Sequence, residues 1–230
     1  MTISARAAAE SAARNSYGRL LAYLAARTRN IAAAEDALAD AFAAACADWP
    51  INGTPDAPDA WLLTAARRKL VDAARRADTA ARAAPEIARA IEQASSDAIG
   101  KDMTDERLEL MFACTHPAID PAIRTPLILQ TVMGLDAARI AGAFLTAPAA
   151  MSQRLVRAKR KIAAARIPFA IPDTALWPTR AADILEAIYA AYTAGGGALV
   201  AEALYLARLV RALAPQEAEA HGLFALIAFI

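Results

Sequence analysis

Alanine is the residue that most constrains the fold of this 230-residue chain. The hydrophobic content of 57% would suit a membrane protein, yet alanine alone supplies about half of it. Alanine is the best helix former and only a weak hydrophobe, so the composition favours many closely packed helices rather than burial in lipid. Alternating β-branched residues, the mark of strands, do not occur, and the single Asn52-Gly53 pair lies in an evident loop. The sequence therefore predicts an all-α protein.

Three further features predict a location in the cytoplasm. No apolar run is long enough to span a bilayer, so we expect no membrane contact despite a mean hydropathy of +0.28. The start of the chain, residues 1–16, lacks a continuous apolar core and carries Glu10, which argues against a secretory signal. The two cysteines, Cys46 and Cys114, fit a reducing compartment better than a disulfide framework. We expect a soluble cytoplasmic protein.

Proline, glycine and the spacing of apolar residues divide the N-terminal part into helices. Apolar periodicity predicts one helix over residues 16–29 and a second over 32–49, ended by Pro50. Residues 50–59, PINGTPDAPD, hold three prolines and a glycine, too many for a helix. A third helix is predicted to begin near Asp59, a good N-cap, and to continue through WLLTAARRKLVDAARR.

The composition after the third helix separates two compact parts of the chain. Few large apolar side chains follow it, which indicates a linker, and three prolines between residues 168 and 178 mark a second boundary. Two small domains on a tether are suited to gripping an extended partner at two separated places, not to enclosing a deep catalytic pocket. The predicted units are a helical domain at 1–78, a linker at 79–103, a second helical domain at 104–168 and a helical C-terminal extension at 169–230.

Residues 151–162, MSQRLVRAKRKI, gather positive charge without any acid in a chain whose net charge is only +1. Upstream, Asp136 can cap a short helix that carries Ile140 and Phe144 inward, and Pro148 suits the first turn of the next helix. This pattern predicts a helix-turn-helix, whose second helix lies in the major groove of DNA. The predicted buried stripe of that helix consists of Met151, Leu155, Ala158 and Ile162.

The remaining polar side chains of this helix are the predicted DNA contacts. Glutamine and arginine can read base edges through paired hydrogen bonds, while the later cations suit phosphates. A solvated cationic face is the alternative, but the preceding helix, the tight turn and the missing acids favour DNA. The predicted contacts are Ser152, Gln153, Arg154, Arg157, Lys159, Arg160 and Lys161.

A second basic cluster occurs in the predicted third helix, with Asp72 as the sole acid within it. Residues seven apart lie on one helical face, which groups most of these cations together. Trp61 opens the same helix beside the proline-rich loop, although a single tryptophan is more often a core residue. Cations, an aromatic ring and an irregular loop together suit a single nucleic-acid strand, in which bases stack and phosphates are neutralised. The cluster consists of Arg67, Arg68, Lys69, Arg75 and Arg76.

Several motifs in a fixed order give the chain a recognisable pattern. Residues 34–50 read AEDALADAFAAACADWP, residues 57–76 read APDAWLLTAARRKLVDAARR, and residues 105–119 read DERLELMFACTHPAI, before the helix-turn-helix. This order resembles the bacterial extracytoplasmic-function sigma factors of the sigma-70 family, especially the subgroup with a helical, repeat-like C-terminal extension. The resemblance implies that the first domain corresponds to sigma region 2 and the second to sigma region 4.

The resemblance also implies partners and residue roles. Region 2 would bind the β′ clamp coiled coil of core RNA polymerase through Glu35, Asp36, Asp40 and Phe42. The loop at 50–59 would accept a flipped base of the −10 element, and Trp61 with the cations of the third helix would hold the opened strand. Region 4 would read the double-stranded −35 element with MSQRLVRAKRKI and touch the β flap, while the linker would thread the RNA exit path.

Some residues depart from the family pattern. Ala149 stands where a glutamate is usual, Arg139 stands where a glutamate often precedes the helix-turn-helix alanine, and Leu145 replaces the glycine common at the turn. The extension carries AYTAGGG in place of an expected Asn-Glu-Gly-Tyr, and the chain stops on the apolar FALIAFI. We expect either truncation relative to related proteins or a covering partner at that end. The extension is a candidate regulator, and whether it activates or restrains the core is open.

Other chemistry is sparse. His116 and His221 are the only histidines, and Cys114 with His116 lacks a second ligand pair for a zinc site, so this segment is better read as a helix end. No nucleophile, base and orienting acid can be assembled, so we expect no enzyme, metal or cofactor. Two rival classes remain. A one-component regulator binding an operator gives the second basic cluster, the proline-rich loop and the acidic helix no role. In a helical interaction or scaffold protein, the basic faces would serve only for solvation.

Overall fold

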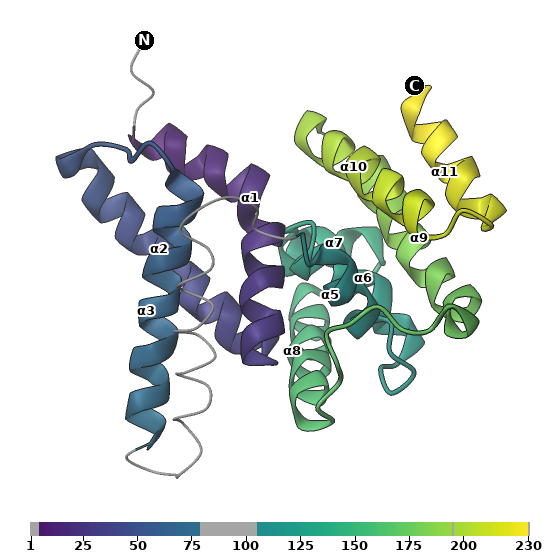
Figure 1. Ribbon diagram of the computed structural model, residues 1–230, viewed down its shortest axis with the longest axis horizontal. Helices are drawn as coiled ribbons and strands as arrows, with labels where there is room; N and C mark the ends of the chain where they lie inside the picture. Colours follow the sequence, from purple (N-terminus) through teal and green to yellow (C-terminus); the bar gives the residue numbers. More distant parts are fainter. Residues whose placement is uncertain (1–4, 79–104, 195, 230) are drawn as a thin grey trace. The chain divides into compact units, whose positions relative to one another are not determined.

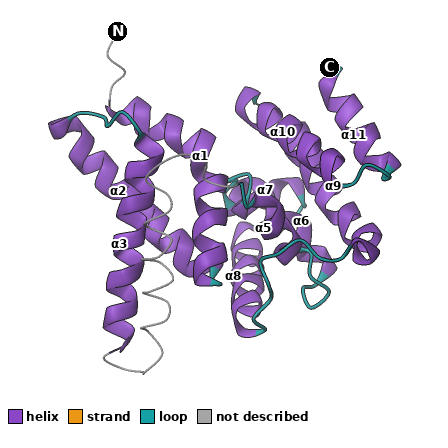
Figure 2. Ribbon diagram, viewed as in Figure 1, coloured by secondary structure: helices purple, strands orange, loops and turns teal. Residues whose placement is uncertain are grey.

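The computed structural model describes residues 5–78, 105–194 and 196–229 (Figure 1). Every regular element in these ranges is a helix (Figure 2), which confirms the all-α prediction. The chain divides into two compact units, Met1–Glu106 and Arg107–Ile230. The predicted linker, 79–103, lies outside the described residues. Within the described ranges, no helix has the length and apolar character needed to cross a bilayer.

The described part of the first unit contains three long helices, α1 (Ala5–Thr28), α2 (Ile31–Asn52) and α3 (Pro58–Asp78). Each of them packs against the other two. Leucines from all three helices, together with Trp49, are almost fully buried between them. Helix α1 begins earlier than the predicted residue 16, because the alanine-rich segment before it has high helix propensity even without large apolar residues.

Helix α2 runs through Pro50, so the prediction that this proline ends the helix is wrong. Proline removes one backbone N–H and crowds the preceding turn, a cost that is confined here because Pro50 lies in the last turn. The helix ends instead at Asn52, and its C-cap is Gly53, whose φ of 88° is a conformation that glycine adopts readily. The N–H of Gly53 donates to the carbonyl of Trp49 at 3.0 Å. The loop between α2 and α3 is therefore shorter than predicted.

The prediction that Asp59 is the N-cap of α3 is wrong, because the helix already begins at Pro58. Proline is favoured in the first helical turn, where its missing N–H has no intrahelical partner to lose. The carboxylate of Asp59 instead accepts hydrogen bonds from Ser16 Oγ at 2.9 Å and Arg19 Nη2 at 2.5 Å. Asp59 thus ties the start of α3 to α1.

The second unit contains the remaining helices of the described residues. The C-terminal helices pack onto the earlier ones, α9 against α6 and α5, and α10 and α11 against α9. The predicted second domain and the predicted extension therefore share one compact unit. The elements are α5 (Arg107–Cys114), α6 (Pro121–Thr131), α7 (Ala137–Ala143), α8 (Pro148–Ala164), η1 (Thr174–Leu176), α9 (Trp177–Ala194), α10 (Gly197–Leu213) and α11 (Ala218–Ala228).

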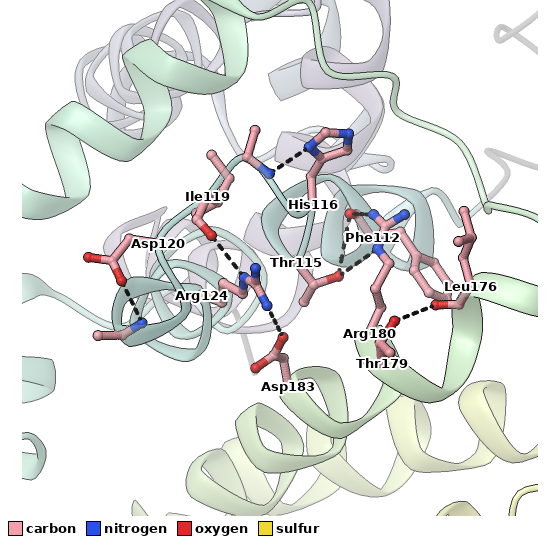
Figure 3. Close-up of polar contacts among 12 residues, drawn as sticks. Phe112, Thr115, His116, Ile119, Asp120, Arg124, Leu176, Thr179, Arg180 and Asp183 are labelled. Carbon is pink, nitrogen blue, oxygen red and sulfur yellow. Dashed lines mark hydrogen bonds and ion pairs between the residues drawn. The ribbon is translucent and has the colours of Figure 1, made fainter.

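A buried arginine on α9 joins the extension to the end of α5 (Figure 3). Arg180 is 7% exposed, and it donates to the carbonyl of Phe112 and to Thr115 Oγ1. The last carbonyls of a helix lack intrahelical partners and carry partial negative charge, so a cation there is stabilising. Burial lowers the pKa of Arg180, and the nearby positive charge of Arg124 adds to this effect. Arg180 acts as a cap for α5 that is supplied by α9.

Two ion pairs reinforce the same packing. Arg124 of α6 contacts Asp183 of α9 at 2.9 Å, and its Nε donates to the carbonyl of Ile119 at 3.0 Å (Figure 3). Arg107 of α5 contacts Glu202 of α10, and its guanidinium lies over the ring of Tyr205 at 4.8 Å from the centroid. The extension is therefore held to α5 and α6 by charged as well as apolar contacts.

Candidate nucleic-acid interface

Helices α7 and α8 lie where the sequence predicts a helix-turn-helix, and they pack against each other across a short turn. Asp136 caps α7 by accepting from the backbone N–H groups of Ala138 and Arg139 at 2.9 and 2.8 Å. Ile140 is buried and Phe144 is half-buried at the end of α7, and Pro148 occupies the first turn of α8. All four residues of the predicted stripe on α8 are buried, which confirms the predicted phase of this helix. The opposite face of α8 is thereby left to solvent.

The turn between these helices departs from ordinary backbone geometry at Leu145. Its φ is 50°, in the left-handed region, and its side chain is 96% exposed. For a residue other than glycine this conformation costs about 1–2 kcal/mol. Almost complete exposure leaves the leucine with little packing to offset that cost. Leu145, which stands where the family pattern has glycine, therefore destabilises the turn.

The exposed face of α8 carries most of the predicted DNA contacts. Ser152, Gln153, Arg157, Arg160 and Lys161 are exposed. Arg157 Nη2 donates to Gln153 Oε1 at 3.3 Å, which aligns the two side chains along one ridge. An amide and a guanidinium side by side offer donors and acceptors suited to base edges.

Arg154 is half-buried rather than fully exposed, because it lies on the flank of α8 that faces α6. Its Nη2 donates to the carbonyl of Ala122 at 3.1 Å. This hydrogen bond holds the guanidinium against the start of α6. Arg154 is therefore fixed in position at the edge of the exposed face.

Lys159 does not lie on the exposed face of α8, where it is predicted to be. Its side chain is predicted to point outward with the other cations of α8, but it is 6% exposed. Position 159 follows Leu155 by four residues and precedes Ile162 by three, so it shares their buried face. The apolar stem of a lysine can occupy such a position. Reading the charge run as one set overlooked this phase.

The cations of α3 likewise fall into exposed residues and a buried one. Arg68, Lys69 and Arg75 are exposed, while the side chain of Arg76 lies outside the described residues. Arg67 is 8% exposed, and its predicted place on the exposed face is a second correction. It follows Leu63 by four residues and precedes Leu70 by three, which places it on the core side.

Arg67 has partners inside the first unit. It donates to the hydroxyl of Tyr23 on α1, and its guanidinium lies 4.9 Å from the centroid of the Tyr23 ring. A buried guanidinium needs such partners, because desolvating an unpaired charge is costly. Arg67 therefore connects α3 to α1 and is not presented to a nucleic acid.

Trp61 is half-buried at the start of α3, beside the loop at residues 53–57. Its ring meets the edge of the buried Trp49 ring, with centroids 5.6 Å apart and planes at 70°. Edge-to-face pairs of this kind are stabilising. Trp49, which the sequence analysis did not single out, thus supports Trp61 from within the core. The half-exposed Trp61 ring lies on the same helix as the exposed cations of α3.

The acidic residues of α2 differ in exposure. Asp36 and Asp40 are exposed, whereas Glu35 and Phe42 are half-buried. Burial raises the pKa of Tyr17 on α1 well above its usual range, and the charge of Glu35 adds to the effect, which places this carboxylate near α1. Asp36 and Asp40 are consequently the more accessible acids of the set.

Asp40 also contacts a residue of the proposed DNA face. Lys69 Nζ lies 3.5 Å from Asp40 Oδ2, and both side chains are largely exposed. An exposed pair of this kind contributes at most about 1 kcal/mol. The acidic surface of α2 and the basic surface of α3 therefore meet at this pair.

The Cys114–Pro117 segment is a helix end, as predicted. Helix α5 ends at Cys114, and His116 Nδ1 accepts from the N–H of Ala118 at 3.1 Å. Burial and the nearby charges of Arg180 and Arg124 lower the pKa of His116. Cys114 is buried, with its sulfur 3.7 Å from Thr131 Oγ1. These contacts give both residues roles in packing.

In the described residues, the first unit presents a basic helix, α3, that begins with a tryptophan, and the second unit presents a basic helix, α8, preceded by a short helix and a turn. Residues 13–79, which span most of α1 and all of α2 and α3, match the family Sigma-70 region 2. This match supports the interpretation of the chain as a sigma factor of the sigma-70 family. That family is non-enzymatic, in agreement with the prediction that the chain is not an enzyme.

One relative extends the similarity across the chain. An uncharacterized protein of Rhizobium meliloti (strain 1021) is 35% identical over 232 residues, covering 94% of this chain and 54% of that protein. The chain thus spans about half the length of the relative it matches. No solved structure matches the chain significantly.

Proposed function

We propose that this chain is a sigma factor of the extracytoplasmic-function type, which binds core RNA polymerase and directs initiation at specific promoters. The observation that carries the proposal is the match of residues 13–79 to Sigma-70 region 2, which falls on the mutually packed helices α1, α2 and α3. A scaffold protein would have no use for that domain. Because the proposed partner is cytoplasmic, we propose the same location for this chain.

The first unit would serve both the polymerase and the opened −10 strand. Asp36 and Asp40 present exposed negative charge on α2, suited to a basic helix such as the β′ clamp, with Phe42 beside them. Arg68, Lys69 and Arg75 would neutralise phosphates of the single strand, and Trp61 would stack on a base. The loop at 53–57 would accept the flipped base, a step that costs a few kcal/mol without such contacts.

The second unit would read the −35 element with α8. Gln153 and Arg157 lie along the exposed ridge and would contact base edges, while Arg160 and Lys161 would contact phosphates. The helix-turn-helix geometry and the buried stripe of α8 support this assignment. Contact of this unit with the β flap remains part of the same proposal.

Run-off transcription with purified core polymerase tests the proposed function. We expect transcripts from a subset of promoter fragments only when the full chain is added to core polymerase. The one-component regulator is the alternative, and it predicts DNA binding by the chain without any chain-dependent transcript. That second result would contradict the proposal.

A further inference from the structure

A hollow of about 440 Å³ lies within the second unit, between the loop that precedes α6 and the flank of α8. Its volume lies within the range of small-molecule sites in proteins. The proposed promoter contacts use the exposed ridge of α8 and do not require a hollow at its side. The lining residues that bear on its chemistry are Ile119, Asp120, Ile123, Arg154, Arg157 and Lys161.

Three cations from α8 line the hollow on one side. Arg154, Arg157 and Lys161 recur at spacings of three and four, so they lie on one flank of the helix. Among the described residues none of them pairs with a carboxylate. Arg154 donates to the carbonyl of Ala122, and Arg157 donates to an amide oxygen. Their positive charge is therefore left to be neutralised by something outside the unit.

The other side carries a single acid with a structural task. Asp120 caps α6 by accepting from the N–H of Ala122 at 3.0 Å. Its charge is thereby directed toward the N-terminus of α6, where negative charge is stabilised by the helix dipole. The net charge of the lining is positive, which selects an anionic ligand.

The floor of the hollow is apolar. Ile119 and Ile123 are 2% and 4% exposed, and Ala158 is 6% exposed. These side chains are already packed within the unit, so the apolar surface still open to a ligand comes mainly from the aliphatic stems of the three α8 cations above the floor. A ring or alkyl body attached to the phosphate would lie against these stems and the floor and remove that remaining apolar surface from water, which a phosphate alone would not do.

We propose that this hollow binds a phosphorylated small molecule of about mononucleotide size, with its phosphate against Arg154, Arg157 and Lys161 and its ring over Ile119 and Ile123. Arginines bind phosphate through paired, charge-assisted hydrogen bonds, and lysine adds a point charge. Two of these cations, Arg157 and Lys161, also belong to the proposed −35 contacts. Occupancy of the hollow therefore competes with promoter binding, and this consequence alone rests on the proposed function.

Calorimetric titration of the full chain with AMP and GMP, at constant ionic strength, tests the site. We expect saturable binding of at least one mononucleotide, and much weaker binding of adenosine and of inorganic phosphate, because each supplies only half of the contacts. Lys161→Gln should weaken nucleotide binding about tenfold, the effect of losing one charge-assisted hydrogen bond. Arg160→Gln is the matched control, since Arg160 carries the same charge on the neighbouring position but does not line the hollow, and it should change affinity less than about twofold.

Saturable binding to neither nucleotide, or equal losses in the two variants, would overturn the proposal. If nucleotides fail to bind while Lys161→Gln weakens binding to duplex DNA, the hollow serves the DNA backbone and the small-molecule site does not exist. If nucleotides bind as expected but the chain fails to bind core polymerase, the site stands and the sigma-factor function falls. The two claims thus fail separately.

Discussion

Helices α3 and α8 carry similar runs of positive charge, but the cations of the two runs differ in their ion pairing. On α8 one cation of the run, Lys159, turns to the core, and the exposed ones pair with no carboxylate among the described residues. On α3 Arg67 turns to the core, and Lys69 pairs with Asp40 of α2. The positive surface of α8 is directly available to a polyanion, whereas part of the positive charge of α3 is balanced by an acid from the preceding helix, α2.

The difference teaches that helical phase, not charge, decides which residues of a basic run reach a partner. Lys159 and Arg67 both lie four residues after a core leucine and three before another core residue. The aliphatic stem of each fits the core, and Arg67 adds a hydrogen bond to Tyr23.

Arg67→Ala and Arg68→Ala form the sharpest pair on α3. Arg67→Ala should lower the free energy of unfolding by about 2 kcal/mol, because it removes a charged hydrogen bond and a buried stem. Arg68→Ala should change it by less than about 0.5 kcal/mol, because the side chain is exposed, yet it should weaken binding to single-stranded DNA. Urea unfolding and fluorescence titration measure the two effects. Equal changes in stability would contradict the burial of Arg67.

Arg157→Ala and Lys159→Met make the corresponding comparison on α8. Arg157→Ala should weaken binding to a selected −35 duplex by about tenfold and reduce the salt slope by about one. Lys159→Met should leave the slope unchanged, because the buried lysine does not reach a phosphate. Affinity is measured across a salt series. An unchanged slope for Arg157→Ala would remove this residue from the DNA contacts.

Leu145→Gly tests the strained turn before α8. Glycine relieves a left-handed cost of about 1–2 kcal/mol, but it adds flexibility to the unfolded chain, which offsets up to about 1 kcal/mol. We expect a net stabilisation of about 0.5–1 kcal/mol, seen as a higher midpoint in thermal unfolding. Leu145→Ala, which keeps the strain, is the control and should not show this gain. A lower midpoint for the glycine variant would mean that the exposed leucine has a packing role.

The Asp40–Lys69 pair should have the smallest effect. A double-mutant cycle with Asp40→Asn and Lys69→Gln should give a coupling energy of no more than about 0.5 kcal/mol, since both side chains are exposed. The coupling should vanish at high salt. A coupling several times larger would mean that α2 and α3 depend on this pair for their packing.

The sequence was most informative where local signals agreed. The Asp136 cap, Pro148 and the stripe from Met151 to Ile162 together predicted the helix-turn-helix, because capping and periodicity are local properties. The prediction that Pro50 ends α2 is wrong, because the cost of a proline is small when it lies close to the end of a helix. Neither result required knowledge of distant contacts.

The attachment of the extension could not be predicted from the sequence. Arg107, Arg124 and Arg180 look like surface cations in the sequence, but they join helices that are 59 to 95 residues apart. Only the fold brings Arg180 to the end of α5. A chain cut near residue 170 would lose these partners, so it would report on folding as well as on regulation.

A variant that removes one interhelical contact at a time is a cleaner probe of the extension. Asp183→Asn weakens the contact of α9 with Arg124 and leaves the chain length unchanged. Transcription by core polymerase with the Asp183→Asn chain, compared with the intact chain, would reveal any regulatory role of the extension without removing a helix. Circular dichroism would confirm that the helical content is retained.

Binding to core RNA polymerase is the property on which the proposed sigma-factor function depends. Isothermal titration of core polymerase with the intact chain, with Asp40→Arg and with Asp48→Arg compares a charge reversal on the proposed contact surface with the same reversal elsewhere on α2. We predict a stable complex for the intact chain and for Asp48→Arg, and loss of the complex for Asp40→Arg with its fold retained. Absence of binding by the intact chain would contradict the sigma-factor function, and normal binding by Asp40→Arg would contradict the assigned surface.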